Sequence, residues 1–82
     1  MGLFGISVND VHRWEKNREV DKIVPALTAK NKEVRLAGIA AFGNLRVSNG
    51  AAFLINGLND NDFDIKRTTR LALLKIGSYA LA

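Results

Sequence analysis

Residues 34–45 read VRLAGIAAFGNL, and this stretch decides the fold. Arg35 is its only charged side chain, and small residues stand among larger apolar ones. At 100° per residue, one broad helical face collects Val34, Ala37, Gly38, Ala41, Phe42 and Leu45. The stretch is too short to span a bilayer. It therefore predicts a helix that is buried by neighbouring helices.

The chain repeats this pattern at an offset of 31 residues. Residues 23–45 align with residues 54–76, with apolar character kept where identity is not. Val34, Phe42 and Leu45 fall on Ile65, Leu73 and Ile76. The residues 31 positions before Phe42 and Leu45 are Val11 and Trp14, which are also apolar. A partial copy therefore precedes the two fuller ones.

Helical periodicity and the breaks between segments predict five helices. Their expected ranges are 8–16, 20–30, 32–45, 51–59 and 63–79. Asn31 and Asp62 are suitable N-cap residues for the two longer helices. The small residues Ala37 and Gly38, and their counterparts Thr68 and Thr69, predict that a neighbouring helix comes close there, which would compensate the cost of a glycine inside a helix. No alternating strand pattern is present in the sequence.

An 82-residue chain predicts a single domain, 1–82. We divide it into a partial copy, 1–18, and two copies, 19–49 and 50–82. Helix pairs that repeat at this period predict an all-α fold, a right-handed α-α superhelix (α-solenoid) of about two and a half helix pairs.

Two segments carry a resemblance to a known family. EVRLAGIAAFGNL (33–45) and DIKRTTRLALLKIG (64–77) resemble the second helix of short HEAT repeats, of the kind found in phycobilisome lyases. The first segment follows the family pattern closely, whereas Thr68, Thr69 and Leu74 depart from it in the second. The resemblance covers residues 8–79 and implies an armadillo-like helical fold whose usual role is to supply binding surfaces.

Composition argues against an enzyme or a metal protein. The chain has no cysteine and one histidine, His12, so it lacks a disulfide and a thiolate metal site. Asp60, Asp62 and Asp64 match the first calcium-loop positions, but Ile65 and Leu71 replace the required glycine and glutamate. Turn formation and N-capping explain these aspartates better. No nucleophile with a base and an orienting group can be named, and we expect no cofactor.

The outward positions of the longer helices suggest a partner-binding face. We expect Leu36 and Ile39 to form its apolar part, and Arg67 and Arg70 to meet acidic groups of another protein. The alternative is lateral packing between adjacent helices, with the arginine stems lying over apolar neighbours.

The C-terminal end predicts self-association. Leu71, Leu74, Tyr79 and Leu81 lie beyond the positions that the last helix needs for its own core. Such an apolar edge is adhesive, which predicts a homo-oligomer joined through residues 71–82. In the alternative, the final residues, SYALA, fold back over the end.

These features favour a non-catalytic protein–protein interaction module or scaffold. The net charge of +4 and the pI near 9.9 are compatible with an acidic partner or a phosphate backbone, although solubility is the favoured explanation. Two alternatives stay open: a nucleic-acid-binding HEAT-like module, which the few aromatic residues disfavour, and a subunit of a bilin (chromophore) lyase. We expect a cytoplasmic protein without a membrane span.

Overall fold

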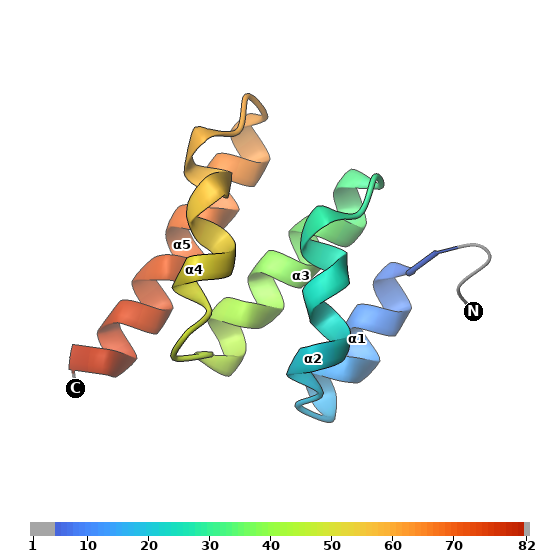
Figure 1. Ribbon diagram of the computed structural model, residues 1–82, viewed down its shortest axis with the longest axis horizontal. Coiled ribbons are helices and arrows are strands. Elements are labelled where there is room, and N and C mark those ends of the chain that lie inside the picture. Colours follow the sequence, from blue (N-terminus) through green and yellow to red (C-terminus); the bar gives the residue numbers. More distant parts are fainter. Residues whose placement is uncertain (1–4, 82) are drawn as a thin grey trace.

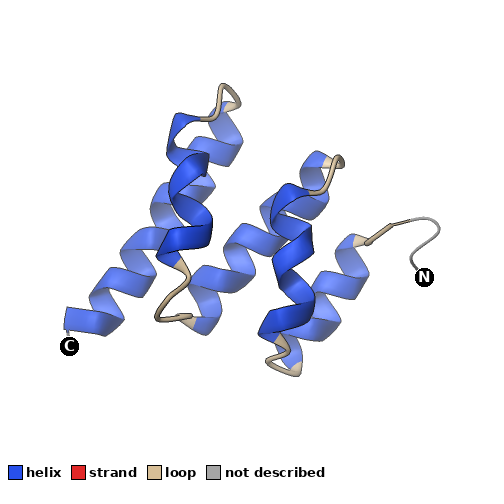
Figure 2. Ribbon diagram, viewed as in Figure 1, coloured by secondary structure: helices blue, strands red, loops and turns tan. Residues whose placement is uncertain are grey.

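The computed structural model describes residues 5–81, and it describes the side chains of residues 5–77. Its helices are α1 (Val8–Lys16), α2 (Val20–Ile23) continued by the 3₁₀ helix η2 (Val24–Thr28), α3 (Lys32–Leu45), α4 (Ala51–Leu54) continued by the 3₁₀ helix η3 (Ile55–Asn59), and α5 (Phe63–Leu81). No strand occurs within residues 5–81 (Figure 2). The predicted all-α class is confirmed, and the five predicted helical segments are present.

The helices form two layers (Figure 1). One layer holds α1, α3 and α5 side by side, with α3 in the middle and in contact with both neighbours. The other layer holds α2 with η2, which lies over α1 and α3, and α4 with η3, which lies over α3 and α5. The Cα atoms extend over 40 × 30 × 16 Å, so the molecule is two helices thick. The middle helix therefore has neighbours on three sides.

The core follows the face predicted for α3. Val34, Ala41 and Phe42 are buried, and Phe42 is wholly inaccessible to solvent. The Phe42 ring meets the edge of Phe53 on α4, with 5.9 Å between the ring centroids. This arrangement is favourable for aromatic pairs, and it joins the two layers at the centre of the molecule.

Asparagine and aspartate side chains begin the two longest helices. The Asn31 side chain accepts a hydrogen bond from the Val34 amide at 3.1 Å. Asp62 Oδ1 accepts from the amides of Asp64 and Ile65 at 2.8 and 3.2 Å. Both predicted N-caps are confirmed. They satisfy amide groups that have no partner within the helix itself.

The segment expected to be helical over 20–30 ends two residues earlier, at Thr28. Ala29 turns the chain into an extended conformation, with φ −64° and ψ 150°. Arg35 Nη1 then donates to the carbonyl oxygens of Ala29 and Lys30 at 2.9 and 3.1 Å. This side chain replaces the hydrogen bonds that a longer helix would have supplied.

Small residues lie where each first helix crosses its longer partner. A Cβ atom built on Gly38 would lie 3.1 Å from the Cβ of Ala26 on η2. In the following helix pair the glycine is on the first helix and the larger residue on the second, because Gly57 on η3 lies against Thr69 on α5. The predicted close approach at Gly38 and Thr69 is confirmed. We call these crossings the Ala26–Gly38 contact and the Gly57–Thr69 contact.

A third glycine sets the distance between α3 and α5. A Cβ atom on Gly43 would lie 2.8 Å from the Cα and 2.9 Å from the Cβ of Ala72. These distances are shorter than atoms in ordinary contact allow. The two helix backbones therefore pack directly on each other at this point.

Candidate interaction surface

The four residues predicted to bind a partner do not share one exposed face. Ile39 is only 5% exposed, so the expectation that it points outward is wrong. Leu36 is partly buried against the core. The reason is the position of α3 between α1 and α5, which covers the side of α3 that Ile39 and Gly43 occupy. For Leu36 and Ile39, the structure favours the alternative of lateral packing.

The open side of α3 instead carries Asn44, which links all three helices of its layer. Asn44 Nδ2 donates to Glu15 Oε2 on α1 at 3.0 Å. Asn44 Oδ1 accepts from Lys75 Nζ on α5 at 2.7 Å. Asn44 and Lys75 are 31 residues apart, so the repeat offset could have revealed this pairing.

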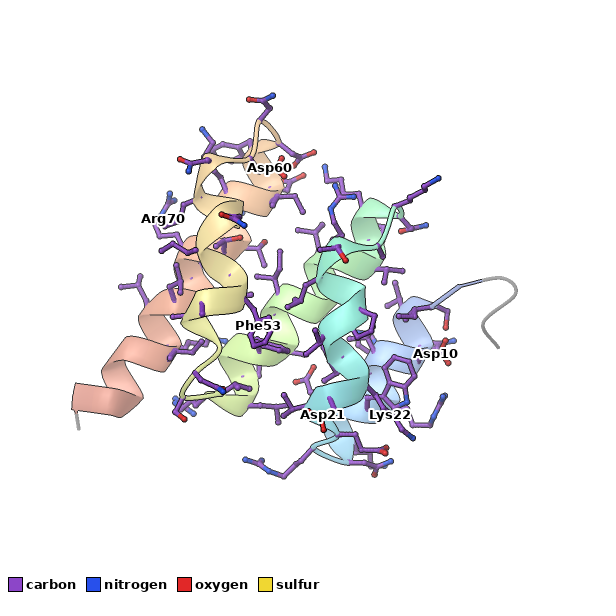
Figure 3. The ribbon with its side chains drawn as sticks, viewed as in Figure 1. Asp10, Asp21, Lys22, Phe53, Asp60 and Arg70 are labelled. Atoms are coloured by element: carbon purple, nitrogen blue, oxygen red, sulfur yellow. The ribbon has the colours of Figure 1, made fainter. Side chains whose placement is uncertain are left out.

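Arg67 and Arg70 are exposed on α5. Among residues 5–77, neither guanidinium has an ion-pair partner, because the ion pairs there join Asp10 with Arg13, Glu19 with Lys22, and Lys32 with Asp62 and Asp64. Figure 3 shows Arg70 on the side of α5 that faces away from α3. This side of the helix is exposed because α5 is the outermost helix of its layer (Figure 1).

Large apolar side chains lie next to these arginines. Leu74 is 60% exposed and Leu71 is 48% exposed, whereas the side chains of Tyr79 and Leu81 lie outside the described residues. Phe63, which the sequence interpretation missed, is 69% exposed at the start of the same helix. We call the stripe formed by Phe63, Arg67, Arg70 and Leu74 the α5 edge.

The α5 edge corresponds to a face that is covered on α3. The residues 31 positions earlier are Lys32, Leu36, Ile39 and Gly43. On α3, Lys32 Nζ bonds to Asp62 and Asp64 of the next pair at 3.0 and 2.8 Å, and Gly43 packs on Ala72. The same face of α5 has no helix against it among residues 5–81. The α5 edge is thus exposed, whereas the corresponding face of α3 is in contact with α5.

Lys32 and its two carboxylates form the main charged cluster between α3 and α5. The Lys32 ammonium holds the pKa of Asp62 below its ordinary value, and the Ile65 and Asp64 amides act in the same direction. In turn, Asp64 and Asp62 raise the pKa of Lys32. Both shifts favour the charged forms of Lys32 and Asp62.

Replacing Lys32 by glutamine is expected to raise the pKa of Asp62 toward its ordinary value near 3.8. Because the folded-state pKa is lowered, this carboxylate stabilises the fold above the ordinary value, and the effect is lost as the pH falls through the folded-state pKa. NMR titration of the carboxyl carbon measures the change. Asp10, whose pKa is lowered mainly by the Ser7 amide, serves as the control and is expected to stay unchanged. An unchanged Asp62 pKa in Lys32→Gln would contradict the assignment.

A cleft of about 270 Å³ separates the first helices of the two pairs. Its apolar wall includes Leu27, Ile39 and Phe53, and its rim includes Arg35 and Asp60. Both charged rim residues already bond to the backbone, Arg35 to two carbonyls and Asp60 to the Asp62 amide. The cleft therefore offers few polar groups to orient a ligand.

The aspartates of the calcium-like stretch serve the fold. Asp60 and Asp62 accept backbone hydrogen bonds, and Asp62 and Asp64 contact Lys32. Within the described part of the chain, no three His, Asp or Glu side chains are placed to share a metal ion. Over the same part, no helix combines the length and apolar character needed to cross a membrane.

Comparisons with models of protein families, with curated proteins and with solved structures found no match. The exposed α5 edge is therefore assigned as the candidate site from the chain's own residues. Its geometry combines two large apolar side chains with two cations on a single helix.

Proposed function

We propose that this protein is a non-catalytic protein–protein interaction module built as a HEAT-like α-solenoid of about two and a half helix pairs. The α5 edge is its binding surface. The order of the helices supports the architecture, since a first helix crosses a longer second helix twice in succession and each pair packs on the next.

The observation that carries the function is the exposure of the α5 edge. Phe63 and Leu74 leave 69% and 60% of their surface in water, although the chain buries the corresponding positions on α3 or engages them in ion pairs. Leu71, which is 48% exposed, lies one turn from Leu74, and neighbouring exposed apolar side chains of this kind indicate a binding site. Aromatic residues and arginine are also enriched in protein interfaces. The α5 edge has both.

Site-specific photo-crosslinking tests this function. A benzophenone amino acid at position 74 samples the α5 edge, and the same group at position 9, on the exposed side of α1, is the matched control. In lysate of the source cells, we expect one protein, identified by mass spectrometry, to be attached at position 74 and not at position 9. Adducts of equal yield at both positions, or none at position 74, would contradict the proposed binding surface.

A further inference from the structure

We infer that the α5 edge takes an amphipathic helix of another protein, with acidic residues at the centre of the helix and apolar residues at its ends. This inference rests on the proposed function and names the kind of partner. It follows from the spacing of the edge residues, from their charge, and from how the chain uses its own carboxylates.

The residues of the α5 edge are spaced as in a helix surface that packs on a second helix. Phe63, Arg67, Arg70 and Leu74 follow one another at intervals of four, three and four residues. This is the heptad spacing, which keeps a stripe of side chains facing a second helix that crosses at a shallow angle. At 1.5 Å per residue the stripe is about 16 Å long, enough for about three turns of a partner helix.

The charge pattern selects an acidic centre for the partner. Arg67 and Arg70 lie one turn apart in the middle of the α5 edge, and no carboxylate among residues 5–77 pairs with them. Nearby Asp64 is bound by Lys32 at 2.8 Å. Arginine binds carboxylates through two parallel hydrogen bonds. Phe63 and Leu74, at the two ends, would exclude water from these ion pairs and strengthen them.

A second copy of the chain fits this surface poorly. Two-fold pairing of the α5 edges would bring the Arg67 and Arg70 guanidinium groups of both copies together, and like charges across an interface oppose association. Asp10, Glu19, Asp62 and Asp64 already pair with cations of their own chain, and the exposed carboxylates outside these pairs, such as Asp21 and Glu33, lie on other helices than α5. The self-association expected from Leu71 and Leu74 is therefore the weaker use of this surface.

A phosphate backbone is also a poor match. The two arginines are bracketed by Phe63 and Leu74, which are the two most exposed of the large apolar side chains in the described structure. Phosphate contacts would leave both of these side chains in water, whereas a helix with apolar ends would bury them. The edge therefore fits a protein helix better than it fits a nucleic acid.

A displayed library of helical peptides tests the inference without a known partner. Four positions at heptad spacing are randomised, and selection is run on the wild-type protein and on the double variant Arg67→Glu/Arg70→Glu. The wild type is expected to enrich Asp or Glu at the two central positions and apolar residues at the two ends. The charge-reversed variant is expected to enrich Lys or Arg at the centre with the same apolar ends.

Synthetic peptides from the two selections complete the test. Each peptide is expected to bind its own protein at least about tenfold more tightly than the charge-reversed one, which corresponds to about 1.4 kcal/mol. Leu74→Glu is expected to weaken both peptides. These substitutions are at exposed positions, so circular dichroism and thermal unfolding should show an unchanged fold.

Selection that shows no charge preference would overturn the acidic-helix inference, while crosslinking at position 74 could still support the proposed function. A dimer detected by light scattering at high micromolar concentration, and abolished by Leu74→Glu, would assign the edge to a second copy. Displacement of the wild-type peptide by a DNA duplex would assign it to a phosphate backbone. Either result would overturn the inference.

Discussion

Gly43→Ala is expected to lower the free energy of unfolding by about 3 kcal/mol, because the added methyl group meets the backbone of α5. The new Cβ atom would lie 2.8 Å from the Cα of Ala72, and a backbone atom cannot turn away as a flexible side chain can. The two helices have to separate, which loosens the contact between the two halves of the core. Urea denaturation followed by circular dichroism measures the loss.

Gly77→Ala is the matched control for this prediction. Gly77 also lies within a long helix, α5, and no described atom lies within 4 Å of a Cβ built there. The same substitution is therefore expected to stabilise the protein by up to about 1 kcal/mol, through helix propensity alone. Equal effects at positions 43 and 77 would show that α3 and α5 do not approach as closely as the structure has them.

Gly57→Ala is expected to cost a similar amount, about 3 kcal/mol, through a clash with a side chain instead of a backbone. The Cβ atom would collide with the Thr69 side chain, which is wholly buried and cannot move into solvent. Thr69 Oγ1 already lacks a hydrogen-bond partner among the described residues, so no polar contact is lost to the collision. The destabilisation is therefore steric.

Thr69→Ala is expected to rescue Gly57→Ala and to restore most of the lost stability. The double variant lacks the Oγ1 and Cγ2 atoms of Thr69, so the remaining close approach is that of the two Cβ atoms at 3.1 Å, which a shift of a few tenths of an ångström relieves. The expected coupling energy between the two positions lies within the range of 0.5–3 kcal/mol typical of residues in contact. A double-mutant cycle by urea denaturation measures it. Additive effects, with no rescue, would contradict the proposed clash.

The helices were predictable because local rules decide them. For α3, the period of apolar residues, the Asn31 cap and the change of composition after Leu45 all act within a few residues, and the predicted range 32–45 matches the structure. The 31-residue offset then transferred the same reasoning to α5. The close crossings at Gly38 and Thr69 were predictable for the same reason, since small residues recur where helices meet.

It was harder to predict which sides of α3 are buried, because a helical wheel gives only the angles between residues of one helix. It separates Val34 from Ile39, but it does not say whether a further helix covers the Ile39 side. That side is covered by α5, so Ile39 is buried and Gly43 is a packing residue. On α5 the equivalent side is open, and Arg70 and Leu74 at the corresponding positions are exposed.

The candidate surface was therefore predicted only in part. Arg67, Arg70 and Leu74 were named from the sequence, but Phe63 was not, and its position seven residues before Arg70 was the signal that could have included it. The Asn44–Lys75 half of the link follows the 31-residue offset, but the Asn44–Glu15 half requires knowing that α1 and α3 share a layer. Such a link depends on tertiary arrangement, which a single-helix pattern does not contain.

The Ala26–Gly38 contact has its glycine on the second helix, and the Gly57–Thr69 contact has it on the first. This difference restricts how one kind of crossing can change into the other. When each residue changes directly into the other kind, the exchange passes through one of two mixed states. Alanine opposite threonine is the clashing state expected for Gly57→Ala. Glycine opposite glycine carries only a propensity cost of about 1 kcal/mol. Of these two states, packing favours glycine opposite glycine, so the size of one side of the crossing constrains which residue the other side tolerates.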